Sequence, residues 1–180
     1  MNKKFTALFA AALFTAGLAA CGTADAHPDS GTGGGNEYEA RTGASIAEDA
    51  EQFRGNFMKT GHWIGATTNH LNFTDDFVIE GDFWDKDDHA NNHKRKVALY
   101  SQDENQNILD RFDLTAPRVI VRSPNTVIAK GRIIGDVHVE ANGFELDDAT
   151  IEGNLSFGSE EYRDSAKLDD GHVTGNISVD

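Results

Sequence analysis

A polar segment at residues 84–96, "WDKDDHANNHKRK", contains the residues whose types and spacing could do metal chemistry. Two histidines four residues apart share one face of a helix, and an imidazole pair joined by a carboxylate is a common zinc site. The carboxylates also suit calcium, although the ordered glycine of an EF-hand loop is missing. The predicted ligands of a divalent cation, calcium or zinc, are Asp85, Asp87, Asp88, His89 and His93. The alternative for this segment is a solvated loop without a metal.

A second set of candidate residues consists of acids in the C-terminal half of the chain. Polysaccharide lyases and hydrolases built on parallel β-helices use acids on outer strand faces, and such a ladder would be formed here by Glu140, Asp147, Asp148, Asp169 and Asp170. The paired acids recur in two "LDD" sequences, as turn residues would. The chain has no nucleophile elbow, zinc-protease motif or phosphate-binding loop. Catalysis therefore stays open, and a protein that is not an enzyme is the stronger prediction.

The N-terminal residues have the pattern of an export signal. Two lysines precede an apolar run that is too short and too rich in alanine for a membrane-spanning helix. The sequence "LAAC" at 18–21 resembles the lipobox of bacterial lipoproteins. The resemblance implies that residues 1–20 are removed and that Cys21 is acylated, which would anchor the chain to a membrane. The alternative is an ordinary signal peptide with an incidental cysteine. The predicted location is the cell surface or the periplasmic face of a membrane.

The charge of the chain limits its partners. The whole chain carries 16 basic and 30 acidic residues, a net charge of −14. Removal of residues 1–20 takes away two lysines and no acids, which leaves a net charge of −16. Such a surface repels phosphate backbones, so nucleic-acid binding is not expected. The predicted partners are the membrane, through the lipid anchor, and an envelope protein or a glycan.

Two segments separate the signal from the rest of the chain. Residues 21–44 are rich in Gly, Ser, Thr and Asp and are predicted to form a flexible tether. Residues 45–60 are predicted to form a short amphipathic helix, because apolar residues follow one another at helical spacing. Ser45 and Glu48 fit a capping box at its start.

An internal repeat occupies the remaining chain. "IIGDVHV" at 133–139, "IEGNLSF" at 151–157 and "VTGNISV" at 173–179 align on glycines spaced by 18 and 22 residues. A fourth copy is "TDDFVIEGDFW" at 74–84. Its glycine, Gly81, lies 54 residues before Gly135, which is three periods of 18. The glycines are predicted to be structural corners: Gly81, Gly135, Gly153 and Gly175.

This repeat predicts an all-β fold. The prediction is a parallel β-helix, or β-solenoid, with coils of about 18 residues over 61–180, interrupted at about 84–96 and capped by the helix at 45–60. Ile151, Leu155 and Phe157 share one parity and should point inward. The Asx residues that follow three of the glycines should form an outward column: Asp136, Asn154 and Asn176.

The phrase [Ile/Val]-x-Gly-[Asp/Asn]-[Val/Leu/Ile] at this pitch resembles the bactofilins, polymer-forming bacterial cytoskeletal proteins. The resemblance implies the fold, but the export signal and the interrupted repeat depart from that family. We therefore expect a membrane-anchored lipoprotein of the cell envelope that acts as a structural or binding scaffold. The alternative is a β-helix protein that binds or degrades polysaccharide with the help of calcium. The last strand of the terminal repeat is expected to expose unpaired backbone groups, which can pair weakly with a second chain. The protein is therefore expected to be a monomer or a weak homodimer.

Overall fold

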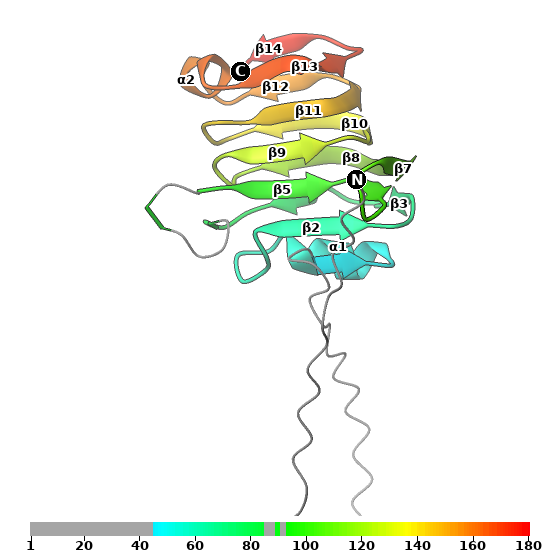
Figure 1. Cartoon of the computed structure of the whole chain (residues 1–180). Helices are drawn as coiled ribbons and strands as arrows, with labels where there is room; N and C mark the ends of the chain where they lie inside the picture. Colours follow the sequence, from blue (N-terminus) through cyan, green and yellow to red (C-terminus); the bar gives the residue numbers. More distant parts are fainter. Residues whose placement is uncertain (1–44, 85–88, 91–92) are drawn as a thin grey trace, which may run out of the picture. The chain divides into compact units, whose positions relative to one another are not determined.

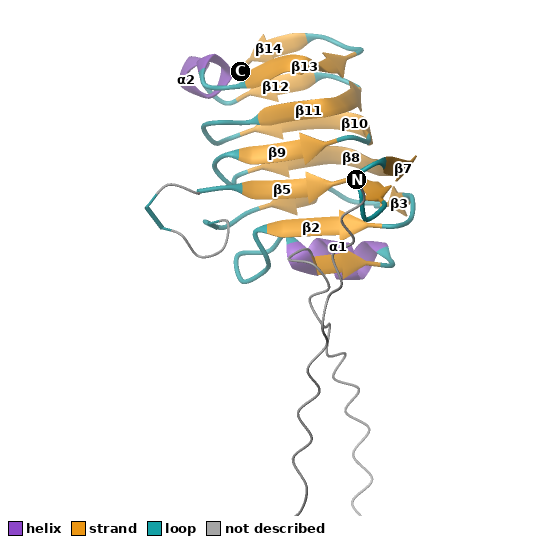
Figure 2. Cartoon of the chain, viewed as in Figure 1, coloured by secondary structure: helices purple, strands orange, loops and turns teal. Residues whose placement is uncertain are grey.

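Strands make up most of the ordered elements, and the strands Phe77–Ile79 and Thr126–Ala129 consist mainly of β-branched and aromatic residues. The computed structural model describes residues 45–84, 89–90 and 93–180, which all lie within one unit spanning 37–180 (Figure 1). Two short helices accompany the strands (Figure 2). The elements are β1 Ser45–Ala47, α1 Ala50–Asn56, β2 Ile64–Thr67, β3 Leu71–Asn72, β4 Phe77–Ile79, β5 Arg95–Ala98, β6 Tyr100–Gln102, β7 Ile108–Arg111, β8 Asp113–Val121, β9 Thr126–Ala129, β10 Arg132–Val139, β11 Glu145–Glu152, β12 Leu155–Phe157, α2 Glu160–Asp164, β13 Lys167–Val173 and β14 Ile177–Val179.

Twelve strands join in one sheet in which every pairing is parallel. Eight of them follow the order β1-β2-β5-β9-β11-β10-β12-β14, and β3, β4, β8 and β13 branch from this path. The strands lie across the molecule one above another (Figure 1). The repeat appears in the pairing register: Val137 of β10 lies opposite Leu155 of β12, 18 residues later. Strands β6 and β7 form a separate antiparallel pair.

The predicted β-solenoid of stacked coils is wrong. The chain forms a curled, all-parallel sheet, a half-barrel with short helices. Strand β10 shows the physical reason, because it runs through Gly135 without a break and pairs with both β11 and β12. The pairing of β10 with β8 changes register between Ile134 and Asp136, and Gly135 has a φ of +138°. A glycine at such an irregularity bends a strand, whereas a coil corner would end it.

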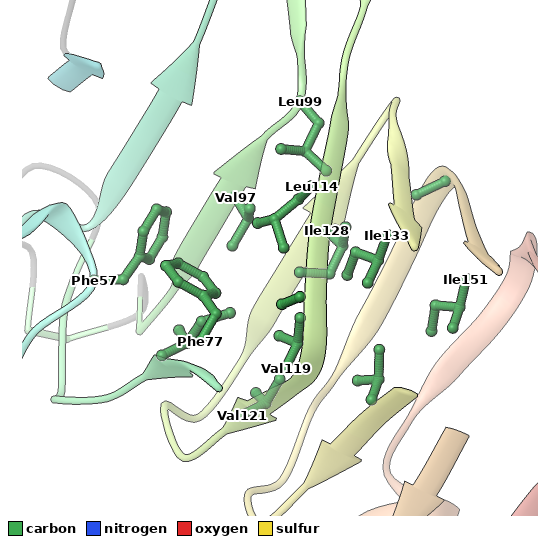
Figure 3. Close-up of a cluster of buried hydrophobic side chains, with 14 of the residues drawn as sticks. Phe57, Phe77, Val97, Leu99, Leu114, Val119, Val121, Ile128, Ile133 and Ile151 are labelled. Carbon is green, nitrogen blue, oxygen red and sulfur yellow. The ribbon is translucent and has the colours of Figure 1, made fainter. Parts of the chain in front are cut away.

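The buried side chains follow the alternation of the strands. Ile151, Leu155 and Phe157 are fully buried, which confirms their predicted inward direction. They continue a cluster that runs past Ile133 and Val119 to Phe77 near α1 (Figure 3). Glu152 and Asn154, between them in sequence, are exposed. Because each strand buries the same parity, one apolar core extends along the curled sheet.

Helix α1 begins later than predicted. The N-cap is Asp49, whose side chain accepts from the backbone amide of Gln52 at 2.9 Å. Ser45 lies in β1, which pairs with β2, so this segment cannot be the first turn of the helix. The predicted start is wrong because an Asx cap lies four residues downstream and the preceding backbone is held by the sheet.

Helix α2 forms in the longer spacing between the last two glycines of the repeat. Ser159 is its N-cap and accepts from the amide of Tyr162 at 3.3 Å. Within residues 45–84, 89–90 and 93–180, no helix is long and apolar enough to cross a bilayer.

Candidate functional site

The structure describes two of the five predicted metal ligands, His89 and His93. His89 and His93 both lie against Trp84, with ring centroids 4.2 and 4.9 Å from the indole. Each nitrogen of His93 also lies 3.3 Å from a protein atom, Nε2 from Asp82 Oδ1 and Nδ1 from Asn125 Nδ2. Asp85, Asp87 and Asp88 lie outside the described residues. In the part of the chain that is described, no three His, Cys, Asp or Glu side chains are grouped so as to hold a metal. The metal site stays a prediction.

The acids of the predicted ladder mostly have basic partners. Asp147 contacts Lys130 Nζ at 2.7 Å, Asp148 contacts Arg111 Nη2 at 2.5 Å, and Glu140 contacts Arg122 Nε at 2.7 Å. The hydrogen bond from Arg111 lowers the pKa of Asp148. The two remaining acids, Asp169 and Asp170, are exposed on β13. Four of the acids lie on the paired strands β11 and β13, whereas Glu140 follows the end of β10, and three of the five act as ion-pair partners.

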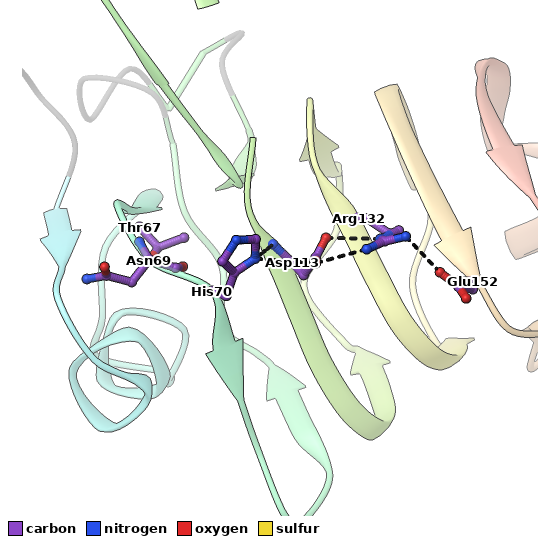
Figure 4. A network of polar contacts seen from close by, with 6 residues as sticks. All are labelled: Thr67, Asn69, His70, Asp113, Arg132 and Glu152. Carbon is purple, nitrogen blue, oxygen red and sulfur yellow. Dashed lines mark hydrogen bonds and ion pairs between the residues drawn. The ribbon is translucent and has the colours of Figure 1, made fainter. Parts of the chain in front are cut away.

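A row of polar side chains crosses the sheet beside these pairs. Arg132 donates to both carboxylate oxygens of Asp113, at 3.0 and 2.9 Å, and to Glu152 at 3.1 Å. The backbone amide of Asp113 donates to His70 Nδ1 at 3.0 Å (Figure 4). Hydrogen bonding by Arg132 lowers the pKa of Asp113. The row fastens three strands to one another from the outside.

The predicted Asx column is confirmed. Asp136 Oδ1 accepts from both the backbone amide and the side-chain amide of Asn154, at 2.9 and 3.0 Å. Asn154 Oδ1 accepts from the backbone amide of Asn176 at 3.0 Å. Each side chain therefore satisfies a backbone amide of the next repeat, and the column is structural.

The predicted corner glycines are places of close approach. A methyl group added at Gly153 would meet the carbonyl oxygen of Gly135, and one added at Gly175 would lie 2.5 Å from that of Gly153. Gly81 and Gly135 also have positive φ angles, +99° and +138°. Three of these glycines thus lie one above another, where a side chain does not fit.

Two of the surface grooves in the described part of the chain combine acidic, basic and imidazole side chains from neighbouring strands. One, of about 510 Å³, has Arg111, Asp113, Arg132, Asp148, Asp170 and His172 in its lining. The other, of about 450 Å³, lies over β8, β10 and β12 and has Arg118, Arg122, His138, Glu140, Ser156 and Asp180 in its lining. The second brings an imidazole, a hydroxyl and three carboxylates together, the third being that of Asp136.

Sequence reasoning missed His138 as a candidate residue. Its signal is the repeat itself: His138 in "IIGDVHV" stands 18 residues before Ser156 in "IEGNLSF". This spacing places the two side chains opposite each other on paired strands.

Comparison of the chain with models of protein families, with curated proteins and with solved structures found no match.

Proposed function

We propose that the protein is an exported lipoprotein, anchored through Cys21, whose curled sheet acts as a structural or binding scaffold at the cell envelope. The observation that carries this proposal is the sequence "LAAC" at 18–21, followed by a Gly- and Ser-rich segment. Cys21 and this segment lie outside the described residues. An acylated cysteine with a long tether would hold a domain near a membrane without a spanning helix.

The described sheet supports a scaffold role through its stiffness. Its buried core continues from one strand to the next, from Phe53 of α1 to Phe157 of β12. On the outside, ion pairs such as Arg132–Asp113 and the Asx column join successive strands. A sheet that is held by a core on its inner face and by ion pairs and hydrogen bonds on its outer face changes shape little. Such rigidity suits the presentation of a fixed surface to a partner.

The Cys21→Ser variant tests the anchor. We expect the variant to leave the membrane fraction or to accumulate as uncleaved precursor, whereas Ser30→Ala in the same predicted tether should fractionate like the wild type. Fractionation followed by intact-mass measurement of the mature N-terminus distinguishes these forms. Processed, membrane-bound Cys21→Ser protein would overturn the proposed anchor.

A second candidate function is glycan binding. The groove of about 510 Å³ favours it, because its lining combines cations, acids and the aromatic ring of Phe112. Such a site offers both donors and acceptors to sugar hydroxyls. If the protein binds glycan with the help of calcium, calcium should raise the midpoint of thermal unfolding by several degrees. A scaffold without a calcium site should show no change in this midpoint.

A further inference from the structure

The groove over β8, β10 and β12 contains a serine whose only hydrogen-bond partner among the described side chains is a histidine. Ser156 Oγ lies 2.8 Å from His138 Nδ1. The two residues are paired in the strand register, with Ile120 of β8 on the other side of His138. The His138 side chain is only 18% exposed, so its ring is held between its neighbours. A groove of about 450 Å³ lies in front of this pair.

The second nitrogen of the same ring faces a carboxylate. His138 Nε2 lies 3.5 Å from Glu140 Oε1, and the other oxygen of Glu140 accepts from Arg122 Nε at 2.7 Å. The hydrogen bond from Arg122 lowers the pKa of Glu140, so this carboxylate is ionised at neutral pH. A proton on Nε2 can be donated to this carboxylate, and the tautomer that carries it there leaves Nδ1 unprotonated. In that tautomer the lone pair of Nδ1 faces the Ser156 hydroxyl.

We propose that Ser156 and His138 form a nucleophile and general-base pair that hydrolyses carboxylic esters bound in this groove. Ser156 Oγ attacks the ester carbonyl carbon and forms a C–O bond, while the hydroxyl proton moves to His138 Nδ1. The bond to the leaving alcohol then breaks, and His138 returns the proton to that alcohol. Water, activated by the same ring, cleaves the acyl-serine to release the carboxylic acid and restore the hydroxyl.

Two further groups suit the charges that develop in this reaction. Asp180 Oδ2 lies 3.4 Å from His138 Nδ1, so the imidazolium formed in the attack would lie between two carboxylates. Arg118 lines the same groove, and its guanidinium makes no ion pair or hydrogen bond to any described residue. A free cation in the groove can interact with the oxyanion of the tetrahedral intermediate. The ester inference is independent of the lipid anchor and of the scaffold role.

A fluorophosphonate probe and p-nitrophenyl acetate test the inference on the full chain. We expect the probe to form a covalent adduct that peptide mass spectrometry locates on Ser156, and we expect Ser156→Ala to lose both the adduct and the ester hydrolysis. His138→Gln should lower the hydrolysis rate about 100-fold or more, as expected for removal of a general base. Because the adduct is located in the wild-type protein, this result does not depend on whether a variant folds.

Ser178→Ala is the matched control. Ser178 lies next to Ser156 in the register of β12 and β14 but lacks the histidine contact, so its removal should leave hydrolysis unchanged. Glu140 is a positioning residue, and Glu140→Gln should lower kcat with little change in KM, because Glu140 contacts the histidine and not the substrate. Absence of an adduct on Ser156 in the wild type, or equal hydrolysis by Ser156→Ala, would overturn the proposal.

Discussion

At the scale of single residues, replacement of glycine by alanine should have opposite effects on stability at Gly153 and at Gly55. A methyl group at Gly153 would collide with the carbonyl oxygen of Gly135, whereas one at Gly55 in α1 meets no atom within 4 Å. We expect Gly153→Ala to destabilise the fold by about 1–3 kcal/mol, because neighbouring strands must move apart. Gly55→Ala should stabilise it by up to about 1 kcal/mol, because alanine favours the helix. Chemical denaturation measures both, and equal effects would contradict the strand register.

Asp113 predicts a dependence of stability on pH. Arg132 lowers its pKa in the folded protein, so the unfolded chain binds this proton more readily. Asp113 therefore contributes stability above the unfolded Asp pKa of about 3.9, and this contribution is lost as the pH falls below that value. The stability difference between the wild type and Asp113→Asn should shrink as the pH is lowered from about 6 to about 3.

Urea unfolding at the two pH values checks this expectation, with Asp110→Asn as the control. Asp110 is exposed on β7, so the control should show no comparable change with pH. A stability difference for Asp113→Asn that does not vary with pH would show that the contact with Arg132 contributes nothing through its charge.

At the scale of elements, Arg95 of β5 joins helix α1 to the sheet. Its fully buried guanidinium donates to the carbonyl oxygens of Asn56 at 2.9 Å and Met58 at 3.3 Å, and it lies over the Phe83 ring at 3.7 Å. Its Nε and Nη1 have no hydrogen-bond partner among the described residues. Burial lowers the pKa of Arg95 to about 9. A cation is thus held at the C-terminal end of α1, where helix carbonyls need donors.

We expect Arg95→Ala to destabilise the protein by about 2–4 kcal/mol, since it leaves a cavity and removes one donor from each of two carbonyl oxygens, which keep only a backbone amide as partner. Arg118→Ala is the matched control, because Arg118 is exposed and should change stability by less than about 0.5 kcal/mol. Hydrogen exchange of α1 should rise in the first variant only. Similar stability in the two variants would mean that Arg95 does not fasten the helix.

At the scale of the whole molecule, charge and an exposed sheet edge act against each other. Strand β14 pairs with β12 and with no other strand among those described, and its Ile177 is 51% exposed. Such an edge favours pairing with a second chain, but a net charge of −14 opposes it. We expect light scattering to detect a weak dimer that strengthens as salt is added. Ile177→Lys should keep the protein monomeric, and a wild-type monomer at high salt and high concentration would contradict this expectation.

The sequence alone determined the features that depend on local period. Inward parity at Ile151 and Leu155, the 18-residue register and the Asx column all follow from alternation along a strand and from equal spacing between repeats. These features are found in the structure because strand pairing fixes which side chains share a face.

Only the tertiary structure decided what depends on packing between distant residues. The period could not show that β10 continues through Gly135, and it is this continuity that makes a curled sheet and not a stack of coils. The burial of Arg95 depends on where α1 docks. The meeting of His138 with Ser156 and Glu140 depends on three side-chain rotamers, on β10, on β12 and on the residue that follows β10. Period specifies which residues are neighbours, whereas bending and rotamer choice are settled by the close packing of the assembled core.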